Sequence, residues 1–157
     1  MPIHLDVPGR GVWSLEHLLL DLNGTVALDG EIIAGVPERL AALSADVTAY
    51  LITADTRGQA VEVGERLAAR LYRIAPGDEA GQKRTLVERL GAEHVVAIGN
   101  GANDAGMLAA AALGIAVLGH EGLATAALHA ADVVVGRIED ALDLLLYPPR
   151  LVATLRR

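Results

Sequence analysis

Short apolar segments alternate with helix-like segments along most of the chain, and this alternation limits the possible folds more than any other feature. The apolar segments cover residues 17–23, 47–53, 71–75, 94–99, 114–118 and 132–135. Most of them are continuous, as expected for strands of a parallel sheet that is covered on both faces. The helix-like segments cover residues 36–44, 59–70, 79–90, 103–112, 123–130 and 138–146. The pattern predicts an open, doubly wound, Rossmann-like α/β sheet.

The two ends of the chain lie outside this alternation. Residues 3–7 and 12–15 flank the turn sequence Pro8-Gly9-Arg10-Gly11 and are typical of a β-hairpin. Residues 147–157 form a tail that is basic at its end. A chain of 157 residues has the usual length of one domain. We therefore expect a single domain over residues 1–157, with the hairpin in residues 1–16.

Composition argues against several classes of function. The chain has a formal net charge of −7 and no Phe, whereas binding to nucleic acid needs a basic surface and often uses aromatic stacking. The absence of Cys excludes disulfides and thiolate catalysis and suits a cytoplasmic protein. The N-terminus does not resemble a signal peptide. The apolar residues 105–118 are fewer than the about 20 that a spanning helix needs, so we expect no membrane insertion.

Polar side chains stand at the carboxyl ends of three predicted strands. Asp21 follows Leu18-Leu19-Leu20, Thr53 ends residues 47–53, and Asn100 follows residues 94–99. The carboxyl ends of parallel strands share one edge of a sheet, where ligands bind. Asp21 and Thr53 could also simply cap the turn and the helix that follow them. Their shared position nevertheless predicts a ligand site at this edge.

Four motifs, taken in order, resemble those of the haloacid dehalogenase-like (HAD) superfamily. They are Leu18-Leu19-Leu20-Asp21-Leu22-Asn23-Gly24-Thr25, Leu51-Ile52-Thr53, Lys83 and Gly99-Asn100-Gly101-Ala102-Asn103-Asp104. The last motif and its continuation are similar to phosphoserine phosphatases and to the phosphorylation domain of P-type ATPases, and the chain looks closest to soluble relatives of that domain. The resemblance implies a magnesium-dependent phosphohydrolase or phosphotransferase that forms an aspartyl-phosphate. The interval between Thr25 and Lys83 is too short for a cap domain.

The resemblance also implies roles for single residues. The implied catalytic residues are Asp21 as the nucleophile, Asn23 and Lys83, which Arg84 could replace. The implied phosphate-binding residues are Gly24, Thr25, Thr53, Ala54, Lys83 and Asn103, joined by the backbone amide of Asp55. The implied magnesium ligands are Asp21, the backbone carbonyl of Asn23, Asn100 and Asp104.

Two amides depart from the commonest pattern of the superfamily. Asn23 stands where an Asp protonates the leaving group and later activates water, which an amide cannot do, so we expect low turnover. Asn100 stands where an Asp binds magnesium, so we expect weaker metal binding. Two functions stay open: a slow enzyme acting on a phosphorylated small molecule or phosphoprotein, or a catalytically weak module that binds phosphate or a protein and regulates another process.

Two further interpretations concern the glycines near Asn100 and the tail. Gly99-Asn100-Gly101 could begin a dinucleotide-binding turn, but the third glycine is missing and the motif comes late in the chain. The resemblance implies that an open site of this kind either acts on large substrates or is closed by a neighbouring subunit. We therefore expect a homo-oligomer in which Arg150 or the terminal arginines approach an adjacent site, with a frayed terminus as the alternative.

Overall fold

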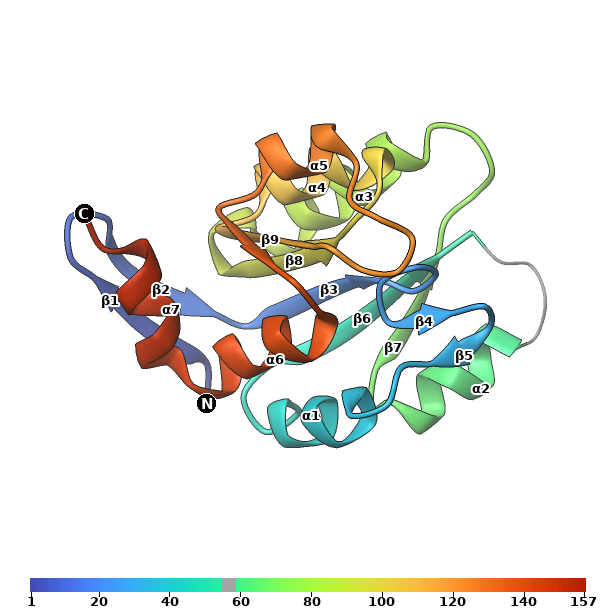
Figure 1. The fold of residues 1–157 in the computed structure, drawn as a ribbon, viewed down its shortest axis with the longest axis horizontal. Coiled ribbons are helices and arrows are strands. Elements are labelled where there is room, and N and C mark those ends of the chain that lie inside the picture. Colours follow the sequence, from blue (N-terminus) through green and yellow to red (C-terminus); the bar gives the residue numbers. More distant parts are fainter. Residues whose placement is uncertain (55–58) are drawn as a thin grey trace.

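The computed structural model describes residues 1–54 and 59–157 and has a six-stranded parallel sheet at its centre (Figure 1). The strands are β3 (His17–Asp21), β6 (Thr48–Thr53), β7 (Arg70–Arg73), β8 (Val95–Gly99), β9 (Leu113–Val117) and β10 (Val133–Val135). They lie in the order β10-β9-β8-β3-β6-β7, and all neighbours pair in parallel. The predicted open α/β sheet is confirmed.

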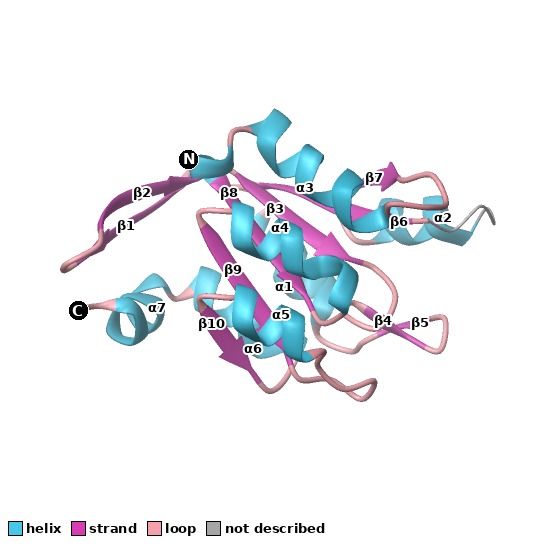
Figure 2. Cartoon of the chain, turned by 90° about the horizontal axis from the view of Figure 1, so that it is seen from above, coloured by secondary structure: helices cyan, strands magenta, loops and turns pink. Residues whose placement is uncertain are grey.

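Helices cover both faces of this sheet (Figures 1 and 2). On one face lie α1 (Val36–Leu43), α2 (Gln59–Arg66) and α6 (Ile138–Leu146), and on the other lie α3 (Glu79–Leu90), α4 (Ala105–Ala110) and α5 (Thr125–Ala130). Short 3₁₀ turns, Ala92–His94 and Ala102–Asp104, precede β8 and α4. α2 ends earlier than predicted because Ala68, with φ of 51°, turns the chain into β7.

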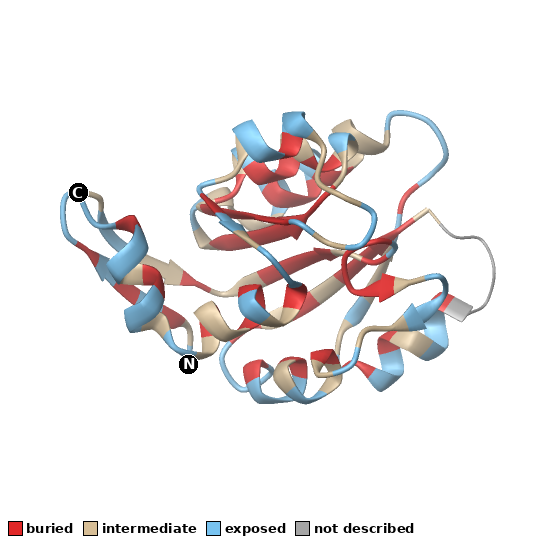
Figure 3. Cartoon of the chain, viewed as in Figure 1, coloured by how far each residue is buried: buried red, intermediate tan, exposed pale blue. Residues whose placement is uncertain are grey.

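The continuous apolar strands are explained by burial on both faces (Figure 3). In β3, Leu18 and Leu20 pack in a core that includes Leu142 of α6. Leu19 points to the opposite face, into a second core that includes Met107 of α4. The register of β3 is therefore fixed, because its three leucines fill the two packed layers.

The N-terminal hairpin and the C-terminal segment form one end of the molecule. β1 (Ile3–Val7) and β2 (Gly11–Leu15) pair antiparallel, which confirms the predicted hairpin. The predicted tail is mostly a helix, α7 (Pro148–Leu155), which buries Leu151 and Leu155. The backbone N–H of Arg157 donates to the carbonyl of Pro8 at 2.9 Å. A frayed terminus is therefore not observed.

A second hairpin, absent from the sequence prediction, follows the first motif. Its strands are β4 (Ala27–Leu28) and β5 (Glu31–Ile32), joined by Asp29 and Gly30 with φ of 52° and 83°. Two left-handed residues with the sequence Asp-Gly are typical of a tight hairpin turn. No cap domain is evident in residues 1–54 and 59–157. Within the same ranges, none of the helices has the length and apolar character needed to cross a membrane.

Candidate active site

The strand register brings the predicted residues to one edge of the sheet. Asp21 pairs with Ile52, so Thr53 lies one residue beyond it on the neighbouring strand β6. On the other side Leu20 pairs with Ile98, so Asn100, just after β8, follows beside Asp21. Asp21, Thr53 and Asn100 therefore meet at the carboxyl edge of the central strands.

Lys83 of α3 points its ammonium group into this edge. The residue is 2% exposed, and its Nζ donates to Asp21 Oδ1 at 3.1 Å, Asp104 Oδ1 at 2.8 Å and Asn103 Oδ1 at 3.3 Å. The adjacent Arg84 pairs instead with Glu88 on the surface of the same helix. Of the two basic neighbours, the structure therefore brings Lys83 to the site.

Asp104 is fully buried and ties the loop after β8 to Lys83. Its Oδ2 accepts hydrogen bonds from the backbone N–H groups of Asn100 at 3.0 Å and Gly101 at 2.9 Å, while Oδ1 accepts from Lys83. Gly99 leaves room for this carboxylate, since a Cβ there would come within 2.8 Å of Asp104 Cβ. The glycine is thus required for close packing.

Thr25 and Asn100 are linked across the site. The buried Thr25 Oγ1 donates to Asn100 Oδ1 at 3.0 Å, and Asn100 Nδ2 donates to the carbonyl of Gly122 at 3.2 Å. Gly24, with φ of 82°, provides the sharp turn between Asp21 and Thr25. Thr25 is therefore more than a turn hydroxyl, because it fixes which way the Asn100 amide faces.

The other predicted residues lie around this centre. Asn23 is exposed two residues after Asp21, and Ala54 is half-buried beyond Thr53. Asn103 accepts from Lys83 and donates through Nδ2 to Glu79 Oε2 at 3.0 Å. Asp55 lies outside the described residues.

Two acidic residues near the site were missed by sequence reasoning. Glu79 begins α3 and accepts a hydrogen bond from Asn103. Its position one helical turn before Lys83 could have indicated that both side chains lie on the same face of the helix. Glu121 lies in the loop after β9, and its carboxylate occupies the space beside Gly24. Nothing in the local sequence predicts this second contact, since it depends on how two loops meet.

The electrostatics of the site are dominated by burial and by two close carboxylates. Burial raises the pKa of Asp21 to about 7, with Asp104 adding to the rise and Lys83 opposing it. For Lys83, burial works against the charged form, but Asp21 and Asp104 outweigh it and raise the pKa. The ammonium therefore stays charged, whereas Asp21 readily holds a proton until another cation arrives.

We expect Asp21 to make the metal-free protein less stable as the pH rises. The pKa of Asp21 rises from its ordinary value of 3.8 to about 7 in the folded protein. The folded state thus retains a proton that the unfolded chain has released, and this contribution is complete below 3.8 and lost as the pH rises through about 7. Urea unfolding of the wild type and Asp21→Asn at acidic and neutral pH measures it. The wild type should lose stability relative to the variant on going to neutral pH, and a constant difference would contradict the shift.

The donor set at this edge fits a hard cation. Asp21 offers a carboxylate, Asn100 an amide oxygen with one lone pair beyond the bond from Thr25, and Asn23 a backbone carbonyl, and oxygen-only sets suit magnesium. Within residues 1–54 and 59–157, no group of three His, Cys, Asp or Glu side chains is arranged to hold a metal ion. The candidate set therefore relies on amide and backbone oxygens as well as on carboxylates.

Solved structures show which fold this is. The cobalt-bound deoxy-D-mannose-octulosonate 8-phosphate phosphatase of Haemophilus influenzae superposes with a TM-score of 0.69 and 16% identity, over 85% of this chain and 88% of that chain. The 3-deoxy-D-manno-octulosonate 8-phosphate phosphatase of Moraxella catarrhalis, in complex with magnesium, phosphate and its sugar acid, gives 0.69 and 17%, over 90% and 94%. The chain therefore has the fold of HAD-superfamily phosphatases.

Two proteins of Methanocaldococcus jannaschii are similar in sequence, while no family model matches the chain. Uncharacterized protein MJ0072 is 54% identical over 39 residues, which cover 25% of this chain and 89% of that protein. Uncharacterized protein MJ0073 is 45% identical over 84 residues, which cover 51% of this chain and 90% of that protein. The chain therefore belongs to the family of MJ0073.

Proposed function

We propose that the chain is a magnesium-dependent phosphohydrolase or phosphotransferase that acts through an aspartyl-phosphate on Asp21. The observation that carries this proposal is the buried Lys83 ammonium, bonded to Asp21, Asn103 and Asp104 at the edge of the central strands. Burying an ion pair costs desolvation energy, so such a group is poor evidence for a purely stabilising role. A fixed cation beside a carboxylate is well suited to stabilising charge on a phosphoryl group.

In the proposed reaction a carboxylate oxygen of Asp21 attacks phosphorus, and the bond from phosphorus to the leaving oxygen breaks. The leaving oxygen takes the electron pair and then a proton from solvent, because Asn23 cannot donate one. Lys83 and Asn103 stabilise the phosphoryl oxygens, together with the Thr53 hydroxyl and the Ala54 amide. Bound magnesium would supply the charge that lets an anionic phosphate approach the carboxylate. Water then hydrolyses the phospho-aspartate, or an acceptor takes the phosphoryl group.

Asp21, the backbone carbonyl of Asn23 and the amide oxygen of Asn100 are three of the four magnesium ligands of this proposal. Asp104 is the fourth ligand of this proposal, because its Oδ1 accepts one bond from Lys83 and keeps a second lone pair for the cation. Its Oδ2 accepts from the backbone amides of Asn100 and Gly101, so the same carboxylate also positions the loop after β8. Its charge still favours a cation nearby.

The substrate class follows from the open edge of the sheet. Because no cap domain is evident in the described residues, the proposed substrate is a phosphorylated small molecule or a phosphoprotein in the cytoplasm. The kinship with soluble P-type ATPase-like domains is part of this proposal and rests on the motif around Asn103. Asn23 specifically favours the second candidate function, a weakly catalytic module that binds phosphate or a protein partner.

Consumption of acetyl phosphate or p-nitrophenyl phosphate in the presence of magnesium tests the proposed function, with Asp21→Asn as the reference. Turnover by the wild type alone supports an enzyme. Magnesium-dependent phosphate binding through Asp21 without turnover would favour the regulatory module.

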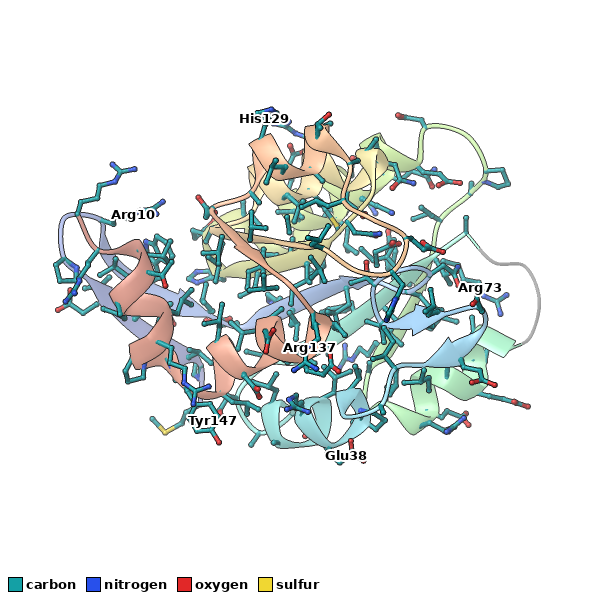
Figure 4. All side chains as sticks on the ribbon, viewed as in Figure 1. Arg10, Glu38, Arg73, His129, Arg137 and Tyr147 are labelled. Carbon is teal, nitrogen blue, oxygen red and sulfur yellow. The ribbon has the colours of Figure 1, made fainter. Side chains whose placement is uncertain are left out.

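A homo-oligomer is the proposed assembly, with α7 as the element that meets a neighbour. Arg73, paired with Thr53, marks the edge that holds the site, whereas Arg10 and Tyr147 lie at the opposite end (Figure 4). Arg150 stacks over the Tyr147 ring at 4.4 Å. The helix could therefore cover only the site of another subunit.

Light scattering tests this assembly. We expect a mass that is a multiple of the 16.3 kDa chain, because closed symmetric assemblies are the usual form of soluble oligomers. A mass equal to one chain at high protein concentration would contradict it.

A further inference from the structure

We propose that Glu121 supplies the negative charge that Asn100 does not, and so acts as an additional carboxylate for the divalent cation at Asp21. This inference rests on the proposed function, because it concerns the cation of the same site. It assigns a role to a residue that lies outside all four motifs.

The position of Glu121 is the first argument. The residue lies in the loop between β9 and α5, and its carboxylate fills the space that a Cβ would take at Gly24. The same position is 3.5 Å from Asn100 Nδ2. The carboxylate thus lies beside Gly24, which follows the proposed ligand Asn23, and beside the side-chain amide of Asn100, a second proposed ligand.

The second argument is that Asn100 itself holds this loop in place. Its Nδ2 donates to the carbonyl of Gly122 at 3.2 Å, and its backbone carbonyl accepts from the N–H of Ala124 at 2.9 Å. A turn closes the loop, since the N–H of Gly122 donates to the carbonyl of Gly119 at 3.0 Å. An ionised Asp at position 100 has no donor for the Gly122 carbonyl. The amide therefore gives up a charge and gains a bond that holds the loop bearing Glu121.

The balance of charge is the third argument. Within the part of the chain that the structure describes, Asp104, Lys83 and Glu121 are charged groups that act on the Asp21 carboxylate. Among these four side chains, Asp21, Asp104 and the Lys83 ammonium sum to one negative charge, and Glu121 brings the sum to two, which matches one divalent cation. Glu121 is exposed, so its ionised form stays solvated. Magnesium usually keeps several waters, through which an outer carboxylate can act without a direct bond.

Titration calorimetry with magnesium alone tests the inference. We expect Glu121→Gln to weaken magnesium affinity by about 10- to 100-fold, the usual cost of removing a group that supports a metal site. Glu93→Gln is the matched control, because it removes the same charge from an exposed Glu that precedes β8, at the opposite end of the strands. Equal magnesium affinity in the two variants would overturn the inference.

A double variant, called the charge-return variant, tests whether the charge of Glu121, and not the structure of its loop, supports magnesium binding. Asn100→Asp combined with Glu121→Gln puts the carboxylate back on the strand end and removes the need for the loop. We expect it to bind magnesium about tenfold or more tightly than Glu121→Gln alone. No gain would refute the argument from charge.

Asp21→Asn distinguishes this inference from the proposed function. If the wild type binds no magnesium, or if Asp21→Asn binds it equally well, the proposed function itself fails. If Asp21→Asn loses binding while Glu121→Gln keeps it, the role of Glu121 alone is wrong. Thermal unfolding with added magnesium gives a second readout, since only a variant that binds the cation gains stability from it.

Discussion

Asp21→Asn should abolish phosphate transfer, lowering the rate by a factor of about 10⁴ or more. A carboxamide oxygen is too weak a nucleophile to attack phosphorus, and the variant also loses charge that attracts the cation. The fold should survive, because Lys83 keeps its bonds to Asp104 and Asn103. The pKa of Asp21 is raised by burial and, further, by Asp104, so a neutral side chain at position 21 also removes a buried charge and its repulsion from Asp104.

Release of phosphate from acetyl phosphate and p-nitrophenyl phosphate measures this loss. Asp29→Asn is the matched control: Asp29 is exposed in the nearby β4–β5 turn, and Asn tolerates its φ of 52°. Calorimetry with magnesium and beryllium fluoride, a mimic of the phosphoryl group, gives a readout that needs no turnover. Hydrolysis at the wild-type rate by Asp21→Asn would exclude the aspartyl-phosphate route.

The sheet and the edge that bears the site were predictable because both depend on local pattern. A continuous apolar strand such as β3 must be buried on both faces, which only a covered parallel sheet allows. Once the sheet is parallel, the carboxyl ends of β3, β6 and β8 must share one edge, and the strand order β8-β3-β6 makes them neighbours. The shared position of Asp21, Thr53 and Asn100 follows from that constraint alone.

Features that depend on contact between distant loops could not be predicted in this way. Glu121 reaches Gly24 only because the loop after β9 packs against the turn after β3. The same is true of Glu79, whose partner Asn103 follows a different strand. No periodicity connects Glu121 with Gly24 or Glu79 with Asn103, because each pair joins segments that follow different strands and meet only through tertiary packing.

Two elements were missed for a different reason, because their local signals were present but short. The Asp29-Gly30 pair is a strong turn signal, yet its flanking strands are too short to show alternation. Pro148 and Pro149 obscured α7, although Pro is favoured in the first turn of a helix and Leu151 and Leu155 lie one turn apart. In α7 the buried leucines, rather than helix propensity, decide the structure.

Asn23→Asp should accelerate hydrolysis of the phospho-enzyme. A general acid–base group typically contributes about 100- to 10,000-fold in rate, which is the upper range of the expected gain. The structure places Asn23 exposed and two residues after Asp21, so a carboxylate there can meet both water and substrate. The backbone carbonyl that we propose as a metal ligand is unchanged by the substitution. The gain therefore reports on proton transfer and leaves the ligand set intact.

The leaving group decides whether this explanation is correct. p-Nitrophenolate departs without a proton, whereas an alkoxide must be protonated as it leaves, so the formation of phospho-aspartate from an alkyl phosphate should gain most. Asn23→Ala is the control that removes the amide without adding an acid, and it should show no gain with either ester. Equal rates for Asn23→Asp and Asn23→Ala on both esters would show that position 23 does not handle a proton. In that case Asn100→Asp alone, which adds a carboxylate at the metal site, would be the variant to test for a gain in turnover.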